Sequence, residues 1–403
     1  MTNRDSPAPI RHQAEIDEVV EMSTAVGTDS SEPGTDEETP SAIKVLSPRR
    51  IQIRRFRQNR LAVVGLVVLI GLYAGALFAG FLAPQVPNHR FVDYIYTPPR
   101  QIHIRDQEGD WQMPFVYGIE QIIDREKFQR IYIEDQTVTY PVQLFVRSDE
   151  YQFLGIWSSQ LHLFGVPEEA GPLLLMGSDD LGRDLFSRIL YGSRLSLTVG
   201  LVGVAFSLIL GLTLGGLSGL YGGWVDNVIQ RLTEGVLAIP TIPLWMGLAA
   251  AVPLGWSQAR TYFAITIILS VVGWTSIARV TRGYFLSLRD EDFVLAARQA
   301  GASEWYIIWQ HLIPSFMSYI LVSLTLAVPA MIMGETALSF LGLGLTEPSV
   351  SWGVLLKDAQ QIREIAFHTW ILLPGAFVIT TVLAFNFVGD GLRDAADPYS
   401  TRN

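Results

Sequence analysis

Cysteine is absent from the 403 residues of this chain, and charged side chains are scarce, at 17%. The first absence excludes disulfide bonds, thiolate catalysis, cysteine-ligated zinc and iron–sulfur clusters. The second absence is unusual, because a soluble domain commonly carries about a quarter charged residues. Together with a hydrophobic content of 49%, the shortage of charge indicates that much of the chain contacts lipid.

A phosphate-binding loop for ATP is also missing. Such a loop needs Gly-Lys followed by Ser or Thr, and none of Lys44, Lys127 and Lys357 follows a glycine. We therefore expect no cofactor on this chain. If ATP drives its work, ATP and Mg²⁺ are bound by another chain, and the energy must cross a protein–protein contact.

The formal net charge of −10 is unevenly distributed along the sequence. Much of the acid lies before residue 40 and between residues 91 and 180, so net charge is a poor guide to partners, and we expect no nucleic acid among them. Residues 1–48 are polar and acidic, and they contain no apolar core of a secretory signal. Because this composition cannot bury enough surface to offset chain entropy, we expect a disordered cytoplasmic leader over 1–48.

Six segments are apolar enough to cross a bilayer, which needs about 20 residues of helix. They are Leu61–Ala83, Leu195–Leu220, Val228–Val252, Tyr262–Ala278, Ser318–Leu343 and Phe367–Phe387. Pro240 and Pro243 should bend the third segment. We therefore predict an all-α integral membrane protein with six transmembrane helices.

Basic residues give the orientation of these helices, because short basic loops stay in the cytoplasm. Arginines gather in 49–60, just before the first span, and four more lie in 279–317. Six crossings then place both termini in the cytoplasm and residues 84–194 outside. We expect 49–83 to comprise a basic interfacial segment and the first helix. The segment 49–60 is either an interfacial helix on anionic lipid or a plain topology signal.

Residues 84–176 form a large extracytoplasmic insertion whose sequence alternates like β-structure. A strict alternation predicts one strand, and it is formed by Val138, Tyr140, Val142, Leu144 and Val146. Turns are expected at Gln107–Asp110 and at Glu134-Asp135. We predict a small β-containing domain between the first two helices, which serves either as a spacer or as a docking site for a binding protein.

Ser178-Asp179-Asp180 has the features of a helix start, because a side chain can cap the helix and acids suit its positive end. An apolar face follows, with Arg183 and two further arginines largely off it. We predict an amphipathic elbow helix on the outer surface, ending at residue 194, before a five-helix core over 195–392 and a cytoplasmic tail over 393–403. The residues singled out in this elbow are Asp179, Gly182, Arg183 and Asp184.

The segment 290–315, between the fourth and fifth spans, is much longer than a tight connection needs. It reads as a helix over Glu291–Ala300, a C-cap at Gly301, and a second helix that Ser303 caps and that ends before Pro314. An apolar helix pair on the cytoplasmic side needs a partner, and tryptophan is a common interface anchor. The candidate contact residues are Asp292, Ala296, Ala297, Arg298, Gly301, Ala302, Ser303, Trp305 and Pro314.

Three further features have competing interpretations. Glu335, in or near the outer end of the fifth span, is either a pathway residue or a snorkelling end residue. Glycines at 211, 215 and 219 predict close helix packing. Ser218 lies in a Gly-x-Ser-Gly sequence typical of intramembrane proteases, but such an enzyme needs a histidine base, and His368 only reaches the edge of a span. A protease and an ion-coupled carrier are the lower alternatives, and no metal site is predicted.

The stretch Ala296–Gly301, with Pro314 downstream, resembles the "EAA" signature of ABC importer permeases. Both alanines, the glycine and the proline match that signature, whereas Leu295, His311 and Ile313 depart from it. The resemblance extends to the oligopeptide/dipeptide permeases of the OppC/DppC-like group through 176–184, 335–344, 351–353, 389–394 and 397–398.

The resemblance implies a six-helix permease subunit in the plasma (bacterial inner) membrane. Such a subunit moves di- or oligopeptides by alternating access and performs no chemistry on them; nickel chelates or another small solute are the alternative cargo. It implies four kinds of partner: a second homologous permease, two ATPase subunits, an extracytoplasmic solute-binding protein and the lipid bilayer. It also implies that 290–315 is the loop that couples the permease to the ATPases.

Overall fold

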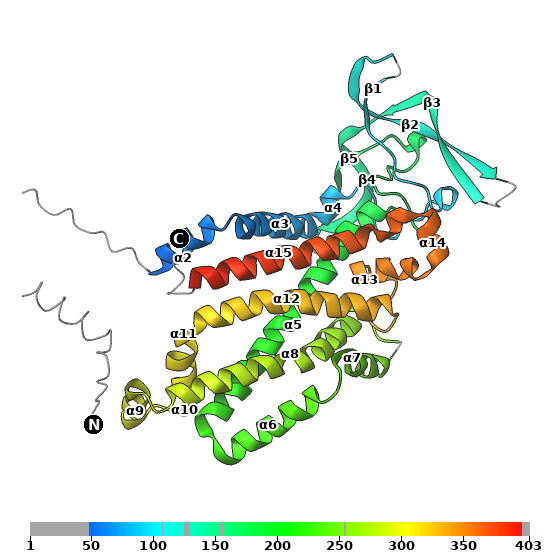
Figure 1. The fold of residues 1–403 in the computed structure, drawn as a ribbon. Coiled ribbons are helices and arrows are strands. Elements are labelled where there is room, and N and C mark those ends of the chain that lie inside the picture. The colour runs from blue at the N-terminus through cyan, green and yellow to red at the C-terminus, as the bar shows by residue number, and fades with distance from the viewer. Residues whose placement is uncertain (1–47, 107, 125–128, 154–155, 254, 397–403) are drawn as a thin grey trace, which may run out of the picture. The chain divides into compact units, whose positions relative to one another are not determined.

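The computed structural model describes residues 48–106, 108–124, 129–153, 156–253 and 255–396 (Figure 1). From Pro48 onward the chain forms one compact unit. The predicted leader, except for Pro48, therefore lies outside the described residues, as do residues 397–403 of the predicted tail.

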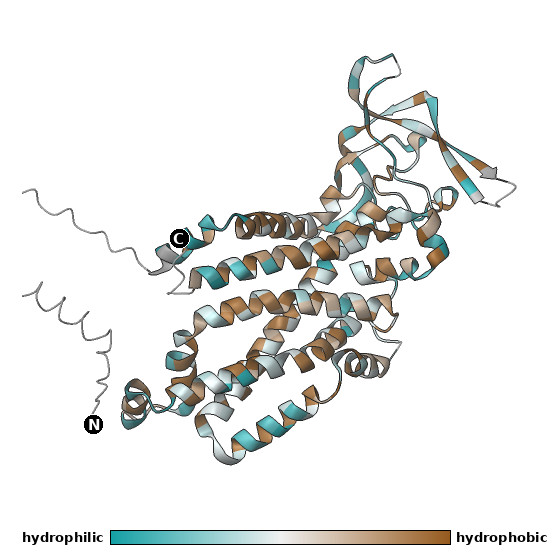
Figure 2. Ribbon diagram, in the orientation of Figure 1, coloured by the Kyte–Doolittle hydropathy of each residue, from teal (hydrophilic) through white to brown (hydrophobic). Residues whose placement is uncertain are grey.

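Five helices in the described part are long and apolar enough to cross a membrane. They are α3 (Arg60–Leu77), α5 (Leu185–Tyr221), α8 (Gln258–Leu288), α12 (Met317–Phe340) and α15 (Leu373–Ala396). Figure 2 shows that apolar residues predominate along them. A sixth candidate is the pair α6 (Gly223–Leu237) and α7 (Thr241–Ala250), which bends by 89°. The bend lies next to Pro240, so the predicted break in the third span is confirmed.

Helices α5 and α8 run parallel to each other. Gly203 of α5 accepts a hydrogen bond from Ser270, and Gly219, farther along α5, lies against Phe285, so the contacting residue numbers rise together. Two parallel helices that follow one another in sequence require the chain to return between them, and α6 with α7 supplies that return. Helices α3 and α15 are antiparallel, because Gly65 lies against Ala384 and Ala62 against Gly391.

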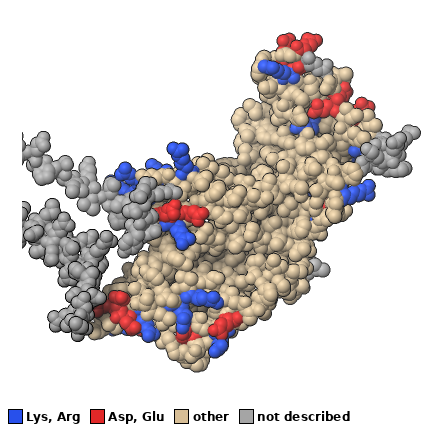
Figure 3. All heavy atoms as spheres, viewed as in Figure 1, with Lys and Arg blue, Asp and Glu red and all other residues tan. Residues whose placement is uncertain are grey.

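The remaining helices are short and lie at the two ends of the long ones. They are α2 (Pro48–Gln58), α4 (Ala79–Leu82), α9 (Asp292–Gln299), α10 (Glu304–Ile307), α11 (Ile313–Ser315), α13 (Trp352–Leu355) and α14 (Ile362–Phe367). We call the end with α2 and α9–α11 the hairpin end, and the end with the strands, α13 and α14 the strand end (Figure 1). On the face seen in Figure 3, charged residues lie mainly toward these ends and along α6.

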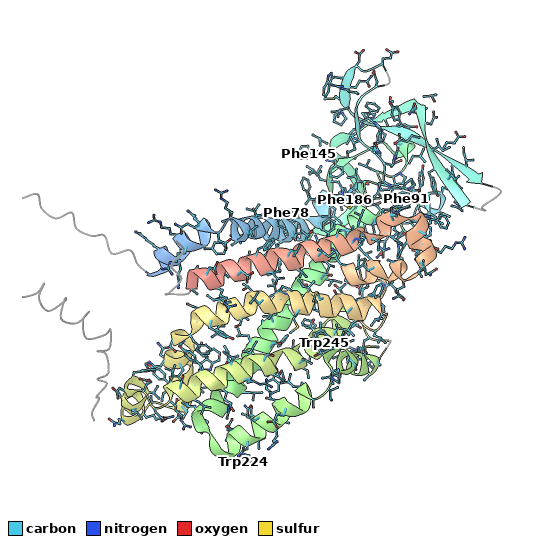
Figure 4. All side chains as sticks on the ribbon, in the orientation of Figure 1. Phe78, Phe91, Phe145, Phe186, Trp224 and Trp245 are labelled. Carbon is cyan, nitrogen blue, oxygen red and sulfur yellow. The ribbon has the colours of Figure 1, made fainter. Side chains whose placement is uncertain are left out.

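The predicted β-containing domain is present between α4 and α5. Strands β1 (His103–Arg105), β2 (Trp111–Asp124) and β3 (Gln129–Pro141) form one antiparallel sheet. Strands β4 (Gln143–Phe153) and β5 (Trp157–Gly165) form a second, two-stranded sheet. The second sheet contacts the end of the first span, because His162 of β5 hydrogen-bonds through Nδ1 to the carbonyl of Ala83 at 2.6 Å. Figure 4 shows Phe78 and Phe145 at this junction.

Two predictions about the strands are wrong. The alternating run 138–146 spans two strands in different sheets, because β3 ends at Pro141 and β4 begins at Gln143. Glu134-Asp135 forms no turn but lies within β3, where the register with β2 shifts opposite Gly118. The other predicted turn is present: Gly109 has a φ of +88°, and the N–H of Asp110 donates to Asp106.

The prediction of a separate elbow helix is also wrong. Helix α5 runs without interruption from Leu185 to Tyr221 and includes the predicted second span and residues 185–194 of the predicted elbow, whereas residues 178–184 precede the helix. Its helical cap is the Asp184 carboxylate, which accepts hydrogen bonds from the N–H groups of Phe186 and Ser187, at 3.3 and 2.9 Å. Ser178 was expected to cap the helix, but its hydroxyl instead bonds Tyr94 and Thr97 in the preceding loop.

Candidate functional site

The helical hairpin Asp292–Ser315 turns sharply at Gly301. The φ of Gly301 is +83°, a conformation that a residue with a side chain rarely adopts. The N–H of Gly301 donates to Arg298 and that of Ala302 to Ala297, each at 3.0 Å, which closes the end of α9. The predicted C-cap glycine is therefore in place, and α9 is stopped by local geometry.

The second half of the hairpin begins with the predicted cap. The Ser303 hydroxyl accepts a hydrogen bond from the N–H of Tyr306 at 3.2 Å. The helix then widens into a π-helical segment over Ile308–Leu312 and continues to Ser315. It does not end before Pro314, as predicted, because proline is compatible with the first turn of the new helical segment that starts at Ile313.

An ion pair joins the two halves of the hairpin. The Arg298 guanidinium donates to both carboxylate oxygens of Glu304, from Nε at 2.9 Å and from Nη2 at 3.2 Å. Arg298 was predicted as a candidate, and Glu304 was missed. Its position in the first turn of the second helix was the available signal, since an acid there suits the helix dipole.

The hairpin is rooted in the ends of the long helices. Four of its side chains, Val294, Ile307, Ile308 and Leu312, have no exposed surface. They belong to one apolar cluster with Phe285 of α8 and with residues of α5 and α12. Because the same cluster contains all three helices, a displacement of the hairpin must act on their ends.

The opposite face of the hairpin is apolar and exposed. Its large side chains are 41–52% exposed: Phe293, Leu295, Trp305, Tyr306 and Trp309. The rings of Trp305 and Trp309 have centroids 5.8 Å apart. We call these five residues the aromatic face. Exposed apolar patches of this kind mark interaction surfaces.

The predicted contact residues divide between the two faces. Asp292, Ala296, Gly301, Ser303 and Pro314 are exposed, as is Trp305. Ala297 and Ala302 are half-buried and pack inward on the apolar cluster, so they support the hairpin rather than its surface. Trp309 was missed, although its position four residues after Trp305 places it on the same helix face.

At the strand end, two of the predicted elbow residues, Asp179 and Arg183, belong to an ionic network whose arginines are buried. Arg183 bonds Asp179 from Nε at 2.7 Å and Glu347 from Nη2 at 2.8 Å. Arg188, which is 1% exposed, pairs with the same two carboxylates. Arg188 was expected off the buried face on the outer surface, and that expectation is wrong, because it is buried and pairs with the buried Asp179 and the half-exposed Glu347.

This network determines the charge state of the loop after α12. Burial raises the pKa of Glu347, but hydrogen bonds from Arg183 and Arg188 outweigh burial and lower the pKa to about 2. Burial and the nearby carboxylates of Asp180 and Asp179 raise the pKa of Asp358 to about 7. Gly182 is required here by space and backbone, since its φ is +73° and a Cβ would lie 2.0 Å from the carbonyl oxygen of Phe91.

Glu335 lies inside α12 and is fully buried. Its carboxylate accepts hydrogen bonds from Ser351 at 2.7 Å, Ser339 at 2.8 Å and Ser196 at 3.3 Å. Each serine in turn accepts a backbone N–H from residues 345–354. Burial excludes the snorkelling interpretation; the carboxylate instead gathers α5, α12 and the following loop around one acceptor.

An apolar cavity of about 480 Å³ lies among α7, α8 and α12. Trp245 of α7 contributes to its wall (Figure 4). The polar groups of the wall are mostly hydroxyls, including Ser276, Tyr319 and Ser323, and none of the described lining residues is charged. Glu335 is not among these lining residues, so the structure does not join it to this cavity.

The glycines of α5 pack as predicted. An added Cβ would lie 2.6 Å from Ile277 at Gly211 and 2.4 Å from Ala278 at Gly215. Ser218 donates to Asp226 at the hairpin end of α5, whereas His368 follows α14 at the strand end (Figure 1). The serine and the histidine that a protease would need are therefore at opposite ends of the helices.

The fold and the hairpin define a class: a multi-span membrane protein whose sequence has no Gly-Lys phosphate-binding loop and whose hairpin end exposes an apolar surface. Two family models match the chain. "Binding-protein-dependent transport system inner membrane component" matches residues 211–401, and "N-terminal TM domain of oligopeptide transport permease C" matches residues 47–99.

Curated relatives extend the match. A dipeptide transport system permease protein DppC of Alkalihalophilus pseudofirmus is 42% identical over 222 residues, which are 55% of this chain and 71% of the relative. A protein of the same name from Lactococcus lactis is 31% identical over 377 residues, 92% of this chain and 96% of the relative. A solved chain of the MetNI methionine ABC transporter, 18% identical, aligns with 53% of this chain and 96% of that one, with a TM-score of 0.40.

The chain belongs to the family of binding-protein-dependent transport system inner membrane components, with the N-terminal domain of the oligopeptide permease C type. It is thus a non-catalytic, multi-pass subunit of the inner membrane, and membership implies an ATPase and a binding protein as partners. Because the alignment with the Lactococcus lactis relative covers 92% of this chain, it extends across the β-containing domain.

Proposed function

We propose that this chain is one of two homologous permeases in an ABC importer for di- and oligopeptides, and that two ATPases act on it through the hairpin Asp292–Ser315. The observation that carries this proposal is that the hairpin has one buried face and one exposed face. Its inner face is buried among α5, α8 and α12, and its aromatic face is exposed. A partner bound to the exposed face therefore has mechanical access to three membrane helices.

The proposed transport mechanism is alternating access. ATP and Mg²⁺ bind to the ATPases, whose closure moves the hairpin and tilts the helices around the cavity beside Trp245. An uncharged wall suits a cargo whose side chains vary, because no fixed charge selects against either sign. The β-containing domain lies at the other end of the helices, where a solute-binding protein would deliver the cargo.

The cargo is proposed from the relatives. Both DppC proteins are named for dipeptide transport, and we extend that class to this chain. Nickel chelates or another small solute are the alternative. Uptake of a labelled dipeptide by the reconstituted complex separates the two cargo classes. Inhibition of this uptake by excess unlabelled peptide, but not by an excess of a nickel chelate, supports the proposal.

The hairpin is tested by Trp305→Ala. Truncating a tryptophan anchor at an interface costs about 2–4 kcal/mol, so we expect the ATPases to co-purify at least about 30-fold more weakly. Trp157→Ala is the matched control, because Trp157 is similarly exposed but lies in β5 at the strand end. If the ATPases are retained fully by both Trp305→Ala and Trp305→Ala/Trp309→Ala, the hairpin is not the docking surface.

We further propose six crossings, with α6 and α7 as one bent span and both termini in the cytoplasm. The return of the chain between the parallel helices α5 and α8 supports this count. The five arginines of α2 lie at the hairpin end, and basic segments favour the cytoplasmic side.

The absence of native cysteine gives a clean test of this topology, because a single introduced thiol has no background. Ser303→Cys and Ser158→Cys each replace an exposed serine, one at each end. We expect a membrane-impermeant maleimide to label Ser158→Cys in intact cells and Ser303→Cys only after permeabilisation. The reverse pattern would contradict the proposed orientation.

A further inference from the structure

A second apolar hollow lies on the surface of the helices at the hairpin end. It has a volume of about 630 Å³ and is lined by residues of α2, α3, α12 and α15. Both α3 and α12 pack against α15, and α2 also contacts α15. We call this hollow the α2 groove. Its apolar wall includes Phe56, Val63, Leu66, Leu321, Val322 and Leu392.

Helix α2 provides one positively charged rim of the groove. Its sequence, PRRIQIRRFRQ, contains five arginines and no acidic residue. Arg50, Arg54 and Arg57 recur at helical spacing on one face and are exposed, and Arg57 itself lines the groove. None of these three arginines forms an ion pair with any residue that the structure describes. Figure 3 shows Lys and Arg side chains gathered over this end.

The helix that carries the arginines is fixed in position. Phe56 packs against the backbone of α15, where a Cβ added at Gly391 would lie 3.2 Å from its ring. Asn59, directly after α2, caps α3 and also donates to Asp394 of α15 at 3.3 Å. Asp394 is therefore bonded to Asn59, and the arginine face is held beside the apolar groove.

We propose that the α2 groove binds an anionic phospholipid, with its phosphate at Arg54 and Arg57 and an acyl chain along Leu66 and Leu321. Guanidinium groups bind phosphate oxygens in a bidentate way, and the apolar wall continues along helices that face lipid. The assignment of this lipid to the cytoplasmic leaflet rests on the proposed topology; the site itself does not.

The bound lipid touches the helix that follows the hairpin. Ser318, Leu321 and Val322 line the groove and lie in the first turns of α12, which begins two residues after α11. An occupied groove therefore holds the hairpin end of α12 against α15 and α3.

The test uses the cysteine-free chain in nanodiscs, within the full complex. Bimane attached to Leu66→Cys reports on the groove, and bimane at Val67→Cys is the matched control, because Val67 has the same depth on α3 but does not line the groove. At equal mole fraction, brominated phosphatidylglycerol should quench Leu66→Cys at least about fivefold more than brominated phosphatidylcholine does, since each arginine near an anionic lipid favours it by about that factor. Val67→Cys should show no preference.

Three further arms identify the occupant. Arg54→Gln/Arg57→Gln should abolish the preference, and excess inorganic phosphate should leave it unchanged. If phosphate removes the preference, the arginines bind a free anion. If deletion of 1–47 raises quenching by both lipids equally, the leader fills the groove. Either result overturns the proposal, as does equal quenching at Leu66→Cys and Val67→Cys. Quenching requires no transport, so this test stands apart from that of the importer.

Discussion

The two ends of this protein differ in which side chains they bury and which they expose. At the strand end, Arg183 and Arg188 are buried and pair with the buried Asp179 and with Glu347, which is half-exposed. At the hairpin end, aromatic side chains such as Trp305 and Trp309 are exposed. Burying charge is costly unless every charge is paired, and exposing large rings to water is unfavourable unless a partner covers them.

The difference assigns a role to each end. The arginines and acids of the strand end pair within the chain, so we interpret this end as a frame around the loop after α12. The hairpin end is finished only on its inner face, where Val294 and Ile308 are buried. We infer that motion enters at the hairpin end and is resisted at the strand end.

The largest expected effect breaks the frame. Arg188→Met should lower the free energy of unfolding by about 3 kcal/mol, because it leaves the buried Asp179 with one arginine fewer, whereas Glu347 is 47% exposed and is partly solvated by water. Unfolding by SDS, followed by tryptophan emission, measures the change.

Arg231→Gln is the control for the frame. Arg231 also pairs with an acid, Glu234, at 2.9 Å, but both side chains are well exposed. Its loss should cost less than about 1 kcal/mol. Equal costs for Arg188→Met and Arg231→Gln would show that the buried network does not stabilise the strand end, and the comparison between the two ends would fail.

An intermediate effect is expected at Glu335. Glu335→Ala removes the acceptor of three serine hydroxyls, and at about 0.6 kcal/mol for each hydrogen bond in a membrane protein the loss is about 2 kcal/mol. Glu335→Gln keeps an acceptor oxygen at the position of Oε1, which accepts the hydrogen bonds of Ser339 and Ser351. Its free energy of unfolding should therefore fall by less than half as much as that of Glu335→Ala. The same SDS titration ranks them.

Glu335 also separates a structural role from a pathway role. A structural carboxylate predicts that Glu335→Gln transports nearly normally, in proportion to its stability. A stable Glu335→Gln protein that no longer transports would instead make Glu335 a part of the pathway and would weaken the contrast between a passive frame and an active hairpin.

Much of the helical architecture was predictable from the sequence. The uncharged spans and the bend beside Pro240 follow from patterns that depend on a single segment. The hairpin was predictable for the same reason, since Gly301 and Ser303 act on neighbouring residues. Local rules therefore sufficed wherever the structure is determined by contacts close in sequence.

The strand end was less predictable, because its structure depends on contacts between distant residues. Arg188 was placed on the surface since nothing near it in sequence shows that Glu347 lies 2.9 Å away. The continuity of α5 was missed for a related reason: Arg188 interrupts an apolar pattern, and only its paired acids show that this position is buried. Glu335 likewise needed Ser196 and Ser351 to be interpreted.

The smallest expected effect sharpens the comparison at the hairpin itself. Arg298 and Glu304 are 31% and 29% exposed, so solvent screens their ion pair. A double-mutant cycle with Arg298→Ala and Glu304→Ala should give a coupling energy of about 0.2–1 kcal/mol in the isolated chain. The same cycle in the assembled complex should give a larger coupling, because a docked ATPase excludes water from the pair. If the coupling is the same in both states, the partner does not cover this part of the hairpin, and the docking surface would be confined to the aromatic face.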